Sequence, residues 1–88
     1  MTAYRYVVRG RVQGVGFRYF ALRQAEALGV AGFARNLPDG RVEVVAEAAA
    51  EVLADFEARL SQGPGFARVE AVDREAIPPR GDQGFHIR

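Results

Sequence analysis

The sequence predicts an α+β fold, a ferredoxin-like split β-α-β plait with two helices on one face of an antiparallel sheet of four to five strands. Three observations support this prediction. Several segments alternate apolar and polar residues as strands do, two segments have the period of amphipathic helices, and glycine or proline separates most of them. The resulting order is β-α-β-β-α-β with a short terminal strand, which gives two right-handed crossovers around a central hairpin.

The first strand and helix are predicted from side-chain type and spacing. Residues 4–12 are rich in β-branched and aromatic side chains, which favours a strand. From Phe17 or Arg18 to Leu28, apolar residues recur with helical spacing. Gly29 follows this helical pattern and is expected to end the helix.

A hairpin is predicted in the middle of the chain. Residues 30–36 and 41–47 have strand character, and Leu-Pro-Asp-Gly at 37–40 separates them. Proline presets the backbone angle of such a turn and glycine accepts a left-handed conformation.

The last third of the chain supplies a second helix and two strands. Residues 49–62 have a helical stripe but a poor N-terminal cap, because alanines stand where serine or aspartate is preferred. Residues 66–75 alternate as a strand, and residues 85–88 form a short final strand. The apolar stripe of the helix consists of Leu53, Phe56 and Leu60.

Length, composition and charge limit the class of protein. We expect one domain, residues 1–88, because 88 residues with 49% hydrophobic content suffice for one core. Without cysteine, a signal-peptide pattern or an apolar run of roughly 20 residues, a cytoplasmic protein with no membrane partner is expected. A net charge of +1 without a basic stripe argues against a nucleic-acid partner. Small size and modest charge favour a monomer.

The segment from Arg9 to Arg18 (Arg-Gly-Arg-Val-Gln-Gly-Val-Gly-Phe-Arg) is the most informative part of the chain. It predicts a strand that runs into a glycine-rich loop and then into a helix. Glycines allow successive N–H groups to turn toward an anion, and the helix N-terminus adds partial positive charge. Arg18 adds a planar fork for two oxygens of one phosphate or carboxylate. The alternative interpretation is a simple tight turn.

The chain lacks the residue types that most other catalytic mechanisms require. All twelve basic side chains are arginine, so a P-loop lysine cannot occur, and a dinucleotide fingerprint would need glycine where Tyr19 stands. Ser61 is expected to cap a helix end or face solvent, and His86 is expected at a strand edge or surface. One histidine without cysteine argues against a transition-metal site, and the four aspartates are isolated. We therefore expect no metal and no cofactor.

Asn36 is the only asparagine and closes the second strand just before the predicted turn. Asparagine commonly initiates turns, and that is one interpretation. In the plait, however, the first loop and the central hairpin can approach each other. A carboxamide facing an anion site could orient a water molecule, because its oxygen accepts and its nitrogen donates hydrogen bonds.

At these residues the chain resembles the acylphosphatase family. Residues 10–18 (Gly-Arg-Val-Gln-Gly-Val-Gly-Phe-Arg) match its first signature, and residues 32–40 (Gly-Phe-Ala-Arg-Asn-Leu-Pro-Asp-Gly) match its second. The resemblance covers essentially the whole chain, including the final strand. Phe33 stands where the family usually has tryptophan, and Ala34 replaces a common valine; both are interpreted as packing changes.

The resemblance implies metal-free hydrolysis of the carboxyl–phosphate bond of acyl phosphates, which releases a carboxylate and inorganic phosphate. By matching motif positions, Arg18 would bind the phosphate and Asn36 would position the attacking water. The phosphate oxygens would be cradled by the backbone amides of Gln13, Gly14, Val15, Gly16, Phe17 and Arg18.

Three other functions stay open at this point. A catalytically silent anion-binding module would need the same loop and Arg18, and an RNA-binding plait would share the fold. An acylphosphatase-like domain detached from a larger carbamoyl-handling enzyme would share both signatures, although we expect a free-standing protein. The sequence leaves the physiological acyl phosphate and the roles of His86 and Arg88 open.

Overall fold

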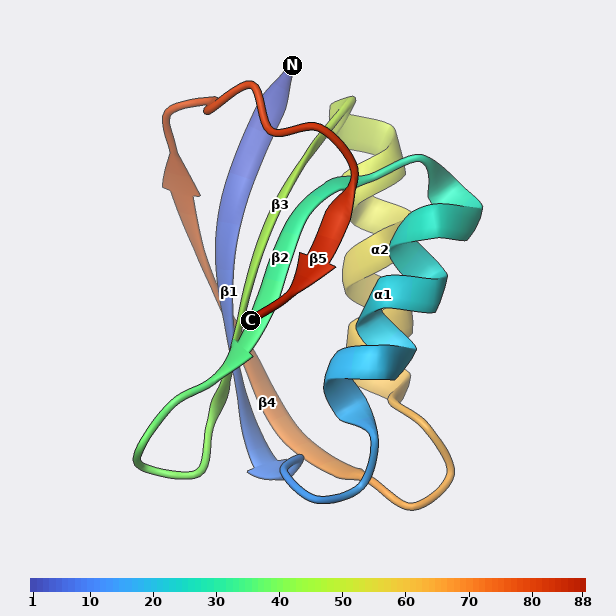
Figure 1. Ribbon diagram of the computed structural model, residues 1–88, viewed down its shortest axis with the longest axis vertical. Helices are drawn as coiled ribbons and strands as arrows, with labels where there is room; N and C mark the ends of the chain where they lie inside the picture. The colour runs from blue at the N-terminus through green and yellow to red at the C-terminus, as the bar shows by residue number, and fades with distance from the viewer.

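The computed structural model describes residues 1–88 and shows the predicted order of elements (Figure 1). The observed bounds lie within two residues of the predicted ones. The elements are β1 (Thr2–Arg11), α1 (Phe17–Leu28), β2 (Ala31–Asn36), β3 (Val42–Ala48), α2 (Ala50–Gln62), β4 (Arg68–Ile77) and β5 (Phe85–Ile87).

The five strands form one sheet in the order β4-β1-β3-β2-β5. The pairs β1–β3, β1–β4 and β2–β3 are antiparallel, as predicted. The prediction of an antiparallel sheet is wrong at one edge, because β5 pairs parallel with β2, with Gly32 opposite Phe85 and Ala34 opposite Ile87. The segment after β4 crosses the end of the sheet at which β2 begins, so β5 starts there and runs in the same direction as β2 (Figure 1).

Both helices cover the same face of the sheet, as predicted, and the main core lies between them and the strands (Figure 1). Each helix contributes a stripe of buried side chains, which confirms the predicted stripe of α2. Neither helix, at 12 and 13 residues, is long and apolar enough to cross a membrane. The stripes consist of Phe17, Ala21 and Ala25 on α1 and of Leu53, Phe56 and Leu60 on α2.

The opposite face of the sheet carries buried charge. Glu43 is 4% exposed, and its carboxylate pairs with the guanidinium groups of Arg5 and Arg35 from the neighbouring strands. Burial by itself raises the pKa of Glu43, but the hydrogen bonds from the two arginines outweigh it, so the pKa is lowered. This face therefore combines charge-assisted bonds with buried apolar side chains, among them Val7, Phe33 and Val45, whereas the helical face is held by apolar packing alone.

Gly32 allows β2 to lie close against β3. Its φ angle is 142°, and a Cβ atom on it would lie 1.9 Å from the main-chain oxygen of Val45. Any side chain would thus push the two strands apart. Because β2 ends at Asn36, the position of this polar residue depends on that close approach.

Candidate active site

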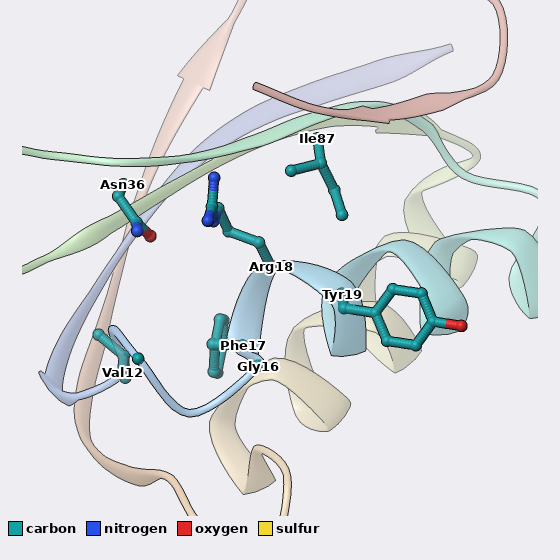
Figure 2. Close-up of a pocket in the computed structure, with 8 residues that line it drawn as sticks. Val12, Gly16, Phe17, Arg18, Tyr19, Asn36 and Ile87 are labelled. Atoms are coloured by element: carbon teal, nitrogen blue, oxygen red, sulfur yellow. The ribbon is translucent and has the colours of Figure 1, made fainter.

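A pocket of about 170 Å³ lies where the β1–α1 loop, the end of β2 and β5 meet (Figure 2). The structure thus brings together the two motifs that the sequence singles out, together with a strand that the sequence did not connect to them. The lining residues are Val12, Gly14, Gly16, Phe17, Arg18, Tyr19, Asn36 and Ile87.

The β1–α1 loop has the backbone that an anion site needs. Gly14 and Gly16 have φ angles of 74° and 77°, in the left-handed region, and Gly16 is the N-cap of α1. In the turns, loops and helix caps, no main-chain N–H group from Gln13 to Arg18 donates a hydrogen bond to a main-chain oxygen. An unpaired run of N–H groups at a helix N-terminus can bind an anion.

Arg18 lies in the first turn of α1 and directs its guanidinium group into the pocket (Figure 2). Its Nη1 donates to the main-chain oxygen of Arg88 at 3.0 Å, and no Asp or Glu side chain lies within 4 Å of it. The N–H group of Arg88 donates to the main-chain oxygen of Ala34 at 2.8 Å. The Arg88 guanidinium also lies 3.9 Å from the ring centroid of Phe33. The Arg18 side chain is therefore oriented from β5 while its charge stays available.

Asn36 is the last residue of β2, and its side chain is exposed on the pocket wall. In Figure 2 its carboxamide and the Arg18 guanidinium extend toward the same space. The pocket thus combines a cation and free N–H groups with an amide that can both donate and accept. Such a set of groups can hold an anion and orient a water molecule beside it.

The side chain of Gln13 connects the two motifs. Its Nε2 donates to the main-chain oxygens of Leu37 at 2.7 Å and Arg41 at 3.0 Å, one on each side of the β2–β3 turn. The sequence assigned Gln13 only a backbone role. No sequence signal for this contact exists, because it depends on a tertiary approach across 24 and 28 residues.

The turn itself is closed by local bonds. Asp39 accepts hydrogen bonds from the main-chain N–H of Arg41 at 3.1 Å and from its Nε at 2.7 Å. The main-chain hydrogen bond from Arg41 lowers the pKa of Asp39. These contacts fix the position of the Arg41 carbonyl that accepts from Gln13.

The other chemically capable side chains lie outside this pocket. His86 is exposed, and its Nε2 bonds to the main-chain oxygen of Gln83 at 2.9 Å, in agreement with the predicted surface position. Ser61 is exposed near the end of α2. No three His, Asp or Glu side chains lie close enough together to hold a metal ion. Tyr19 and Ile87, by contrast, line the pocket although sequence reasoning had not selected them.

Comparisons of sequence and structure show which family this chain belongs to. Residues 4–87 match the profile of the family described as Acylphosphatase. The chain is 56% identical over 81 residues to an acylphosphatase of Thermus thermophilus, and the match covers 92% of each protein.

Solved structures show the same fold. The crystal structure of acylphosphatase from Bacillus subtilis superposes with a TM-score of 0.97 at 38% identity, over 100% of this chain and 99% of that one. HypF of T. kodakarensis contains a similar fold, with a TM-score of 0.87 at 37% identity over 100% of this chain, but the match covers only 12% of HypF. Both signatures, the fold and the extent of these matches agree, and the chain belongs to the acylphosphatase family.

Proposed function

We propose that this protein hydrolyses the carboxyl–phosphate bond of acyl phosphates without a metal ion, and that Arg18 and Asn36 are its catalytic residues. One observation carries the proposal: Arg18 and Asn36, from two separate sequence motifs, line one pocket beside a loop of unpaired N–H groups. Family membership supports the reaction, since the curated relatives are named acylphosphatases.

The phosphate group binds in the β1–α1 loop. The N–H groups of Gln13 to Arg18 surround its oxygens, and the helix N-terminus and the Arg18 fork balance its charge. Preorganised donors of this kind stabilise a phosphoryl group most where its charge develops in the transition state. The left-handed angles at Gly14 and Gly16 support this role, because they are typical of anion-binding nests.

The Asn36 carboxamide holds the attacking water. Its oxygen accepts a hydrogen bond from the water and thereby directs the water oxygen toward phosphorus. A bond forms between this oxygen and phosphorus, and the phosphorus–acyl oxygen bond breaks with its electron pair going to the carboxylate. The proton of the water passes to a phosphate oxygen of the substrate. A carboxylate is a good leaving group, so no acid is needed to protonate it.

The partners follow from the same pocket. A volume of about 170 Å³ suits a small-molecule acyl phosphate and its product, inorganic phosphate. The modest net charge of +1 supports a protein without a nucleic-acid partner. We infer that the protein acts as a cytoplasmic monomer of one domain that needs no cofactor, and its match over 92% of the Thermus relative supports the single-domain assignment.

The decisive experiment measures benzoyl phosphate hydrolysis with a metal chelator present. We expect Arg18→Ala to lower kcat/KM by at least about 10²–10³, because one preorganised donor of this kind contributes that much. Asn36→Ala should lower mainly kcat, because it removes water positioning and leaves phosphate binding intact. Arg9→Ala, an exposed arginine paired with Asp73 on β4, is the matched control and should behave like the wild type.

Two results would contradict the proposal. Near-wild-type hydrolysis by Arg18→Ala or Asn36→Ala would remove the assigned roles, and activity abolished by the chelator would overturn the metal-free mechanism. Binding of inorganic phosphate without any turnover would favour the silent anion-binding module.

A further inference from the structure

We propose that Tyr19 and Ile87 form a subsite for the acyl group of the substrate, and that this subsite selects acyl phosphates with an aromatic or otherwise apolar acyl group. The inference rests on the proposed function, because it places the phosphate of the same molecule against Arg18 and the β1–α1 loop. It goes further because it assigns a binding place to the acyl group, whereas the two signatures concern only the phosphate group and the water.

Exposed apolar side chains gather at this pocket. Only four large hydrophobic residues of the chain are exposed, and two of them line the pocket: Tyr19 at 57% and Ile87 at 41%. The other large apolar lining residues, Val12 and Phe17, are 1% exposed and belong to the core. Tyr19 and Ile87 thus form a partly exposed apolar rim of the pocket. Large apolar side chains left together in solvent commonly mark a binding surface.

The direction of the reaction places the acyl group on this rim. In phosphoryl transfer the attacking and leaving oxygens lie roughly in line with phosphorus between them. A water held by Asn36 approaches from the β2 side of the pocket. Figure 2 shows Asn36 on one side of the Arg18 side chain and Tyr19 and Ile87 on the other. The leaving carboxylate, and the acyl group attached to it, therefore points toward Tyr19 and Ile87.

Both rim residues are fixed directly beside the phosphate-binding arginine. Tyr19 follows Arg18 in the first turn of α1, and the Arg23 guanidinium lies 5.9 Å from its ring centroid. Ile87 pairs with Ala34 in the sheet and precedes Arg88, whose main-chain oxygen accepts from Arg18. An acyl group that leaves the phosphate site therefore meets a ring and a branched side chain on regular elements. Burial of apolar surface against them stabilises the bound substrate.

A second hollow offers the acyl group a different location. It has a volume of about 430 Å³ and is lined by Arg11, Gly14, Val15 and Phe66. Phe66 is 87% exposed. It shares only Gly14 with the pocket that holds Arg18 and Asn36, and neither of these two residues lines it. Phe66 therefore provides a matched control: another exposed aromatic residue near the loop.

The test compares two substrates that share the phosphate and differ in the acyl group. The kcat/KM for benzoyl phosphate is divided by that for acetyl phosphate, in the wild type and in each variant. We expect Tyr19→Ala and Ile87→Ala to lower this ratio about 3- to 10-fold, the range for loss of one apolar or aromatic contact. Tyr19→Phe should keep the ratio, because the ring rather than the hydroxyl makes the contact. Phe66→Ala should also keep it.

Four other results would contradict the subsite, its location, its apolar character or the proposed function. If the wild type hydrolyses both substrates and neither alanine variant on the rim changes the ratio, the subsite is wrong. If Phe66→Ala lowers the ratio instead, the acyl group lies in the second hollow, which Phe66 lines. If Tyr19→Phe lowers it as much as Tyr19→Ala, the apolar class is wrong. If the wild type hydrolyses neither substrate, the proposed function itself fails. Circular dichroism of each variant checks that these surface substitutions leave the fold intact.

Discussion

Gln13 shows how one side chain can hold two halves of a site together. Its amide donates to the main-chain oxygens of Leu37 and Arg41, and so ties the loop before α1 to the turn after Asn36. Arg18 and Asn36 lie on different elements, and the Gln13 side chain hydrogen-bonds directly between those two segments. The distance between the proposed phosphate and water positions depends on these two bonds.

We predict that Gln13→Ala lowers kcat by about tenfold while inorganic phosphate still binds, because a displaced water position costs rate more than affinity. The free energy of unfolding should fall by about 1–2 kcal/mol for the two lost hydrogen bonds. Steady-state kinetics and urea unfolding measure the two effects. Gln24→Ala is the matched control, since Gln24 accepts a hydrogen bond from Arg59 away from the pocket. An equal loss of kcat in both variants would show that Gln13 has only a structural role.

At the residue scale, the sequence was enough to predict that the segments of Arg18 and Asn36 approach each other and that His86 lies at the surface. Residue type and spacing carry that information within short motifs. The bond from Arg18 to the main chain of Arg88 spans 70 residues and uses a carbonyl group that every residue has. No residue pattern encodes such an acceptor, so this contact emerged only from the structure.

At the element scale, the strand that completes the pocket is also the one whose pairing was mispredicted. β5 has three residues, and its parallel pairing with β2 needs a long connection instead of a tight turn. The hairpin of β2 and β3 was predicted correctly because Pro-Asp-Gly is a local signal. For β5 the only signals were alternation and length, which do not reveal a direction.

The close approach of β2 and β3 gives a stability prediction. We expect Gly32→Ala to lower the free energy of unfolding by more than about 3 kcal/mol, because its Cβ would overlap the Val45 carbonyl in a well-packed sheet. Gly40→Ala is the control. Its φ angle of 95° is also positive, but nothing lies within 4 Å of its Cβ, so only backbone strain of about 1–2 kcal/mol is expected. Urea unfolding of both variants measures the difference; equal losses would contradict the steric explanation.

At the scale of the whole molecule, the two faces of the sheet respond differently to pH. The helical face is apolar, whereas the other face holds Glu43 between Arg5 and Arg35. The pKa of Glu43 is lowered in the folded state from its usual 4.5, so the unfolded chain takes up this proton first as the pH falls. The stabilisation by Glu43 is complete above about pH 4.5 and is lost as the pH falls through its folded-state pKa.

We therefore predict that the free energy of unfolding of the wild type falls below about pH 4.5, and that Glu43→Gln has a shallower dependence there. At pH 7 the variant should be about 1–3 kcal/mol less stable, the modest range that suits partly exposed arginine partners. Urea unfolding at a series of pH values measures both. Glu51→Gln, at an exposed carboxylate without an ion pair, should follow the wild-type curve. Identical curves for all three proteins would contradict the assignment.

The hydrogen bond between Arg18 and Arg88 has a consequence for the order of events in folding. The guanidinium group belongs to the first helix, and its acceptor directly follows the last strand. A nascent chain that has emerged only through β4 has both signatures but neither this acceptor nor Ile87. Non-local pairings of this kind form late, since a long loop must close before they contribute. If Arg18 has the proposed role, we expect activity to require the finished sheet and to appear during refolding only when β5 docks.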